Sequence, residues 1–259
     1  MTNHFTLEWA SLSDVGRKRA NNEDTVLIAP EHGFAILADG MGGYNAGEVA
    51  SCMAVESISA GLTGWVRNAA SRLTGQRGAP FTVTAALQTL QACVAEANHA
   101  IYEDARTQPD HAGMATTLVM ALVYQGQLLI GHVGDSRAYR WRGGTLTQLT
   151  RDHSILQEQV DLGMITPEQA AAWRHRNLLT RGLGVEAAVL LDTQATPLRK
   201  HDVYLLCSDG LTDMVSDAEI AAVLDSGLPL SDMAQVLINQ ANTGGGQDNV
   251  TVALMRVTA

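Results

Sequence analysis

The chain has 259 residues, 46% of them hydrophobic, and its 27 acidic residues against 17 basic ones give a formal net charge of −10 at pH 7. This length predicts one large domain with a buried core and is too short for two domains of comfortable size. The excess of acidic residues argues against nucleic acid, which is itself a polyanion, as a partner.

No apolar run approaches the roughly 20 residues of a membrane span, and the N-terminal segment MTNHFTLEWA lacks a basic-then-apolar signal pattern. The three cysteines, Cys52, Cys93 and Cys207, are odd in number and lie far apart in apolar segments. This pattern favours reduced, buried thiols over a disulfide framework or a zinc site. We therefore expect a soluble, cytoplasmic protein without membrane contact.

The first third of the chain predicts strands followed by two helices. Alternating or apolar runs at 4–12, 25–29 and 33–38 predict strands, and the Gly-, Asn- and Asp-containing segment 13–24 predicts a loop. Helices are expected at 46–62 and 82–106. The second of these carries an apolar stripe in steps of three and four residues, at Val83, Leu87, Leu90, Val94, Ala97 and Ile101.

The segment 63–80, between these helices, has three glycines, three arginines and no acidic residue. We interpret it as a solvated loop, with a docking site for an acidic partner as the alternative.

Short strands joined by tight turns follow, a pattern typical of antiparallel sheets and not of alternating βαβ units. Strands are predicted at 115–124, 127–133, 137–141, 145–149, 189–194, 202–208 and 250–255. Helices are predicted at 154–162, 217–224 and 230–240, and Thr166 to Gln169 has the N-cap pattern of a further helix.

Four of these strands have an aspartate at one end. Asp39 ends the apolar run 34–38, Asp135 and Asp209 follow two further runs, and Asp248 precedes the last one. One strand that ends in Asp-Gly is usually only a turn. Four such ends are poorly explained by coincidence and indicate a cluster of carboxylates.

Carboxylates and backbone carbonyls are hard oxygen ligands that suit Mg²⁺ or Mn²⁺, and the eight histidines show no zinc-type spacing. Two such ions can share a carboxylate and activate a bridging water for attack on phosphorus. Arg19 is the candidate for binding the phosphate, with Arg17 and Lys18 as possible helpers. Other catalytic classes lack their motifs: Asp213 stands six residues after Cys207, where a thiol phosphatase needs Arg, and neither a P-loop nor a G-x-S-x-G motif is present.

A series of short motifs between residues 13 and 251 resembles the ordered motifs of the metal-dependent protein phosphatases, the type 2C or PPM family, in their compact bacterial form. The motifs are Ser13 to Arg19 with Asn22, Glu23 and Asp24; Asp39 to Gly43; Ala115 to Thr117; Gly134 to Arg137; Asp152 to Ser154; Thr180 to Gly184; Ser208 to Leu211; and Asp248 to Thr251. The resemblance implies an α+β fold, a four-layer αββα sandwich of two central antiparallel sheets flanked by helices. It also implies that residues 1–259 form a single catalytic domain, with a flap subdomain at about 154–184.

The resemblance further implies roles for individual residues. Asp39 would bridge two core metal ions, Asp209 and Asp248 would complete one site, and the Gly40 carbonyl would complete the other. Two more acidic residues, Glu23 and Asp24, would act mainly through metal-bound waters. Asp135, with Asp209, would hold a third and weaker ion, and Arg19 would bind the substrate phosphate.

By the same resemblance, the expected activity is hydrolysis of phosphoserine and phosphothreonine in proteins, by attack of a hydroxide that bridges two Mn²⁺ or Mg²⁺ ions. The expected partners are phosphorylated proteins, including a serine/threonine kinase and its substrates, and we expect a monomer. Two alternatives are a non-catalytic phosphoprotein-binding or sensing domain and a hydrolase of small phosphate esters. Met41 stands where many eukaryotic relatives have a proton-donating His, so the proton would come from a metal-bound water or from another residue such as His153, which is equally interpretable as a structural cap.

Overall fold

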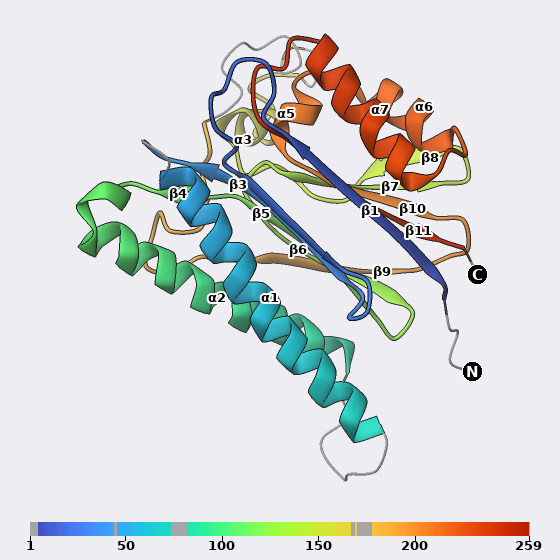
Figure 1. Ribbon diagram of the computed structural model, residues 1–259, viewed down its shortest axis with the longest axis horizontal. Helices are drawn as coiled ribbons and strands as arrows, with labels where there is room; N and C mark the ends of the chain where they lie inside the picture. Colours follow the sequence, from blue (N-terminus) through green and yellow to red (C-terminus); the bar gives the residue numbers. More distant parts are fainter. Residues whose placement is uncertain (1–4, 44–45, 74–81, 167–168, 170–177, 259) are drawn as a thin grey trace.

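The structure is a computed structural model that describes residues 5–43, 46–73, 82–166, 169 and 178–258. Two antiparallel sheets form its centre (Figure 1). In the first sheet the order is β1 (Leu7–Asp14), β11 (Val250–Val257), β10 (Val203–Cys207), β7 (Arg137–Arg142) and β8 (Thr145–Gln148). In the second it is β2 (Asp24–Ala29), β3 (Phe34–Met41), β5 (Leu118–Tyr124), β6 (Gln127–Val133) and β9 (Asp192–Pro197), and β4 (Ala115–Thr116) pairs with β3.

Helices cover the outer face of each sheet, so the molecule has four layers (Figure 1). On the second sheet lie α1 (Ala46–Leu73) and α2 (Val83–Thr107), and on the first lie α5 (Asp209–Thr212), α6 (Asp217–Asp225) and α7 (Leu230–Thr243). The other helices in the described part of the chain are the short 3₁₀ turn η1 (Pro109–His111) and α3 (Ile155–Asp161). The α+β, four-layer αββα sandwich expected from the sequence is confirmed.

Strand periodicity explains why the central runs are apolar at every position. In β3, Phe34 and Ile36 pack with the core under α1 and α2, whereas Ala35 and Leu37 pack between the two sheets. Because side chains alternate along a strand, Asp39 continues the series that points toward the other sheet. The strand β3 therefore needs apolar residues on both faces, and its last carboxylate faces the layer between the sheets.

The strand pairing brings the acidic ends together. At the end of β10, Cys207 pairs with Arg137 on one side and with Val252 on the other. Antiparallel pairing thus places the segments before β7, after β10 and before β11 at the same end of the strands of the first sheet. In the second sheet Asp24 pairs directly with Asp39. The aspartates of both sheets therefore lie at one end of the sandwich.

The helix α1 is longer than the sequence predicted. The segment from 63 onward was interpreted as loop because of its glycines, but the helix continues to Leu73. Trp65 and Val66 extend the apolar face onto the core, and the Trp65 ring contacts Tyr124 edge-on at 5.0 Å between centroids. Tertiary packing therefore outweighs the local helix-breaking signal. Residues 74–80 of the predicted loop lie outside the described residues.

The segment Ala46–Ala69 of α1 is long and apolar enough to cross a membrane, a test that the core helix of a soluble protein also passes. In this fold one side of it, including Ala50, Ala54 and Ile58, is completely buried against the second sheet.

Two other predictions differ in detail. The strand predicted at 189–194 is β9, which begins three residues later, because the Leu190 carbonyl accepts a hydrogen bond from Arg181 instead of joining the sheet. The short helix α5 was not predicted. The N-cap pattern predicted near residue 166 is present, since Thr166 and Gln169 exchange hydrogen bonds of 2.8 and 3.2 Å, but residues 170–177 lie outside the described residues.

The turn from β10 into α5 depends on glycine. A Cβ at Gly210 would collide with the backbone carbonyl of Asn249, next to the start of β11.

We expect Gly210→Ala to destabilise the protein by about 2–3 kcal/mol, because the main-chain atoms that the added Cβ would meet cannot move aside as the flexible end of a side chain could. Thermal unfolding should show a fall of roughly 4–12 °C. Gly64→Ala in α1 is the matched control, since nothing lies within 4 Å of its added Cβ, and it should be neutral or stabilising. Equal melting temperatures for the two variants would contradict this interpretation.

Candidate metal centre

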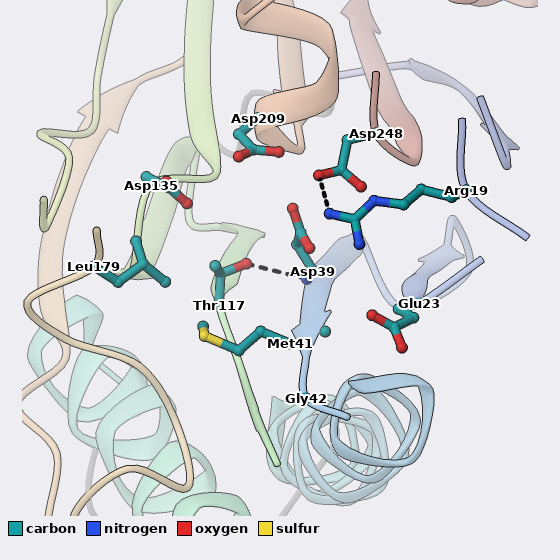
Figure 2. Close-up of a pocket in the computed structure, with 11 residues that line it drawn as sticks. Arg19, Glu23, Asp39, Met41, Gly42, Thr117, Asp135, Leu179, Asp209 and Asp248 are labelled. Atoms are coloured by element: carbon teal, nitrogen blue, oxygen red, sulfur yellow. Dashed lines mark hydrogen bonds and ion pairs between the residues drawn. The ribbon is translucent and has the colours of Figure 1, made fainter. Parts of the chain in front are cut away.

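A pocket of about 180 Å³ opens at the end of the sandwich where the acidic strand ends meet. Figure 2 shows carboxylates from several elements directed toward it. The pocket is lined by Arg19, Glu23, Asp39, Gly40, Met41, Gly42, Thr117, Asp135, Leu179, Asp209 and Asp248.

The backbone around Asp39 is held by the neighbouring segment at β4. The Asp39 N–H donates to the Thr117 hydroxyl at 3.0 Å, and the Asp39 carbonyl accepts from the Thr117 N–H at 2.8 Å and from the Thr116 hydroxyl at 2.9 Å. These bonds use the main chain of Asp39 and leave its carboxylate directed into the pocket (Figure 2). Thr117 thus fixes this residue without competing for its carboxylate.

Asn249 connects the other acidic segments. Its side-chain oxygen accepts from the Glu23 N–H at 2.8 Å, and its amide nitrogen donates to the carbonyls of Val15 and Asn21 at 3.0 and 2.9 Å. The loop that carries Arg19 and Glu23 is therefore tied to the residue directly after Asp248.

Arg19 reaches into the pocket from its rim, with 52% of its side chain exposed. Its Nη2 donates to Asp248 Oδ2 at 2.7 Å, and this hydrogen bond is the largest cause of a raised pKa for the guanidinium. A guanidinium that remains charged at the mouth of an acidic pocket is suited to binding a phosphate.

Asp24 differs from the other acids because it lies behind the pocket and does not line it. Its Oδ2 accepts from the Ser208 hydroxyl at 2.8 Å. Its Oδ1 is buried and has no hydrogen-bond partner within the described ranges. Burial raises the pKa of Asp24 to about 6. A buried carboxylate oxygen without a partner is costly and fits a site completed by a cation or an ordered water.

The same electrostatic problem affects the acids of the pocket itself. Burial, followed by the charge of Asp24, holds the pKa of Asp39 well above its ordinary value. Burial, followed by the charge of Asp135, does the same for Asp209. Burial also raises the pKa of Glu23, and burial with the charge of Asp152 raises that of Asp135 to about 7. Like charges in a poorly solvated space oppose one another's ionisation, and a bound divalent cation would relieve this repulsion.

The donor set fits Mn²⁺ or Mg²⁺, because every candidate donor is an oxygen. In the described part of the chain, no three or more His, Cys, Asp or Glu side chains converge closely enough to form a ready-made metal cage. The carboxylates line the pocket instead. Such an arrangement suits ions that keep several water ligands when bound to protein.

Of the eight site residues predicted from the sequence, all except Asp24 line this one pocket. The possible phosphate-binding helpers Arg17 and Lys18 are exposed and do not line it. His153 does not line it either. Thr117 belonged to one of the motifs quoted above but was given no role in the site, and Leu179 was missed. The polar Thr116-Thr117 pair before an apolar strand was a usable signal for the first, whereas nothing in the local pattern marks Leu179.

Comparison with known proteins gives this geometry a family. The model of the protein phosphatase 2C family matches residues 16–252. The chain belongs to the protein phosphatase 2C family. The serine/threonine phosphatase Stp of Listeria innocua is 41% identical over 247 residues, which cover 94% of this chain and 93% of that protein.

Solved structures of this phosphatase family agree with the fold. The crystal structure of the Mycobacterium tuberculosis serine/threonine phosphatase PstP/Ppp superimposes with a TM-score of 0.85 at 39% identity, covering 98% of this chain and 99% of that one. The catalytic domain of PstP in complex with two manganese ions gives a TM-score of 0.82 at 39% identity, covering 98% and 100%. The chain is a metal-dependent serine/threonine protein phosphatase of the Mn²⁺- or Mg²⁺-using type.

The crowding of the carboxylates predicts a specific pH dependence of stability in chelator. Folded Asp135 keeps its proton up to about pH 7, whereas an unfolded Asp loses it near pH 4. The folded state therefore binds more protons, and its stability falls as pH rises between these two values. We expect Asp135→Asn in EDTA to exceed wild type in stability by about 2–4 kcal/mol at pH 8, or roughly 4–16 °C, with the difference shrinking toward pH 4.

Thermal melts at pH 8, 6 and 4 measure this difference. Asp225→Asn, which removes an equal charge from the exposed end of α6, is the control and should show no such trend. A stability difference for Asp135→Asn that does not depend on pH would be evidence against a raised pKa.

Proposed function

We propose that this phosphatase hydrolyses phosphoserine and phosphothreonine in proteins at the pocket of Figure 2, with the pocket residues in the roles that the sequence resemblance implied. The observation that carries the proposal is the convergence of five carboxylates and one arginine on a single pocket. A cluster of acids alone would repel a phosphate dianion. Divalent cations bound to the carboxylates would offset this repulsion, and the pocket, with its arginine, is then suited to binding a phosphate ester.

In this proposal Asp39 would contribute to both core cation sites, Asp209 and Asp248 would complete one site, and the Gly40 carbonyl would complete the other. The two manganese ions of the PstP catalytic domain, at 39% identity, support this number. Glu23 and Asp24 act through water molecules. The unpartnered Oδ1 of Asp24 supports such a role, because a buried carboxylate oxygen needs a donor. Asp135 with Asp209 would hold a third, weaker ion.

When bound, the cations supply an activated water as nucleophile and offset the negative charge of the phosphoryl group. The Arg19 guanidinium turns from Asp248 toward the phosphate and orients it by charge-assisted hydrogen bonds. The activated water gives up one proton to solvent, its oxygen attacks phosphorus, the bond to the Ser or Thr oxygen breaks, and that oxygen takes up one proton. Met41 has no acidic proton to donate to the leaving oxygen, so in this proposal water in the pocket is the proton donor.

His153 is not the proton donor in this proposal. It lies outside the pocket lining, and its ring nitrogens face Gly134 on one side and Asp192 on the other.

The proposed substrates include a serine/threonine kinase of the same cell and the proteins that it phosphorylates. Reduced cysteines support a cytoplasmic location, since all three are free thiols. We propose a monomer of one domain, 1–259, because the chain's own helices cover both sheets. Residues 154–184 would be its flap. The hydrogen bonds that join its two ends, Ile155 N–H to the Leu178 carbonyl at 2.9 Å and Thr180 N–H to the His153 carbonyl at 2.9 Å, support this boundary.

Phosphate release from a phosphothreonine peptide tests the assignment. With Mn²⁺, we expect Asp39→Asn to lose about 100-fold or more in kcat, since the cations contribute several kcal/mol to the transition state. Arg19→Met should raise KM by roughly 10-fold or more, because it removes a charge-assisted contact to phosphate. Chelator should abolish turnover by wild type.

Asp225→Asn is again the control with an equal change of charge, and it should retain wild-type turnover. Full activity of Asp39→Asn would exclude the proposed centre. A folded wild type that hydrolyses p-nitrophenyl phosphate but no phosphopeptide would favour a small-ester hydrolase instead.

A further inference from the structure

His153 forms a two-bond clamp with the residue next to Asp135. The Gly134 N–H donates to His153 Nδ1 at 3.0 Å, and the His153 N–H donates to the Gly134 carbonyl at 2.7 Å. Both backbone groups of Gly134 are therefore held by one residue that lies nineteen positions later in the chain. A clamp of this kind fixes the peptide planes on both sides of Gly134 and so the direction in which the chain enters Asp135.

The other side of the imidazole is held as well. Its Nε2 lies 3.2 Å from Asp192 Oδ2, and Arg181 Nη1 donates to Asp192 Oδ1 at 2.8 Å. Because Nδ1 accepts the Gly134 N–H, it carries no hydrogen, and the single ring proton is therefore on Nε2, where it is donated to Asp192. Asp192 thus selects the tautomer that the clamp needs. Arg181, whose Nη1 also lies 3.2 Å from His153 Nε2, holds Asp192 in place by the ion pair.

Packing restricts the ring further. The side chain is almost completely buried, and its ring lies against that of His132 with centroids 4.6 Å apart. The His153 carbonyl also accepts from the Thr180 N–H at 2.9 Å. The residue has no freedom to turn toward the pocket while these contacts are present.

A second set of contacts also holds the Asp135 segment. Gly134 has a φ of +105°, and a Cβ there would collide with the Thr117 side chain. Thr117 also shares a hydrogen bond of 2.7 Å with the Ser136 hydroxyl. Asp135 is therefore carried by a short turn between Thr117 and His153, with its carboxylate directed into the pocket (Figure 2).

We propose that His153 is a positioning residue, which through Gly134 holds the Asp135 carboxylate at the cation site, and that Asp192, held by Arg181, fixes its tautomer. This proposal rests on the proposed role of Asp135 as a cation ligand. It assigns His153 neither to proton donation nor to simple helix capping, since the cap of α3 is the neighbouring Ser154.

Two near-isosteric substitutions separate the functions of the ring. Asn places an oxygen acceptor where Nδ1 lies and so can keep the Gly134 bond, whereas Gln places a donor near Nε2 and loses that acceptor. We expect His153→Gln to weaken the lowest-affinity class of Mn²⁺ binding by about 10-fold in calorimetric titration, as loss of an outer partner of a metal ligand does. His153→Asn should bind Mn²⁺ within roughly threefold of wild type.

A control variant distinguishes a loss of Mn²⁺ binding from a general loss of stability. Arg142→Met breaks the bidentate pair with buried Asp202, which precedes β10 at its end away from Asp209. It should lower the melting temperature without changing Mn²⁺ binding. If His153→Gln does not fold, Asp192→Ala replaces it as the test variant, because the Asp192 side chain is 52% exposed and its removal leaves the core intact. Asp192→Ala should weaken Mn²⁺ binding by about threefold, and unchanged Mn²⁺ binding in this variant would then overturn the proposal.

Asp135→Asn, measured in parallel, distinguishes the two levels of the argument. If it weakens Mn²⁺ binding while His153→Gln binds as wild type does, the positioning role is overturned and the proposed centre stands. If Asp135→Asn itself binds Mn²⁺ unchanged, Asp135 is not a ligand and both assignments are wrong. Weakened binding in both, with recovery in His153→Asn, supports both.

Discussion

Repulsion between carboxylates at one end of the sandwich is the constraint on which the rest of this structure depends. Asp39, Asp135 and Asp209 share a poorly solvated pocket, and burial together with the charge of neighbouring acids raises the pKa of each. Such a cluster opposes folding unless something else holds it. The two sheets supply the support, because strand ends are the least mobile places to anchor short acidic segments. The acidic site therefore destabilises the fold, and the burial of apolar side chains in the three cores offsets this destabilisation.

Neutral groups set the positions of the charged ones. Thr117 holds the main chain of Asp39, Asn249 holds that of Glu23, and His153 holds that of Gly134. Each of these contacts is to backbone, so it fixes geometry without adding charge and leaves the carboxylate oxygens available. A charged partner would serve less well, since it would compete with the cations for the same oxygens. Arg19 is the exception, and its exposed position at the rim allows it to exchange Asp248 for a phosphate.

Local patterns in the sequence were enough for much of the fold and for the acidic part of the site. Alternating or continuous apolar runs located most strands, and the apolar stripe of α2 predicted that helix to within a residue at each end. Asp39, Asp135, Asp209 and Asp248 were recognisable because each one lies at an end of an apolar run. Their order along the chain matched that of a known family, which supplied the sandwich topology and the proposed pairing of ligands. None of these inferences needs a contact between distant residues to be known in advance.

Tertiary structure alone decided the features that depend on contacts between distant segments. The continuation of α1 depends on the contact between the rings of Trp65 and Tyr124. The late start of β9 depends on the hydrogen bond that Arg181 donates to the Leu190 carbonyl. The clamp of His153 on Gly134 joins residues that no periodicity relates, so the sequence left this histidine between a proton donor and a cap. A sequence pattern reports how one segment prefers to fold and which face it buries. Which side chain meets which backbone group is set only when the two sheets pack, because that geometry belongs to the assembled layers.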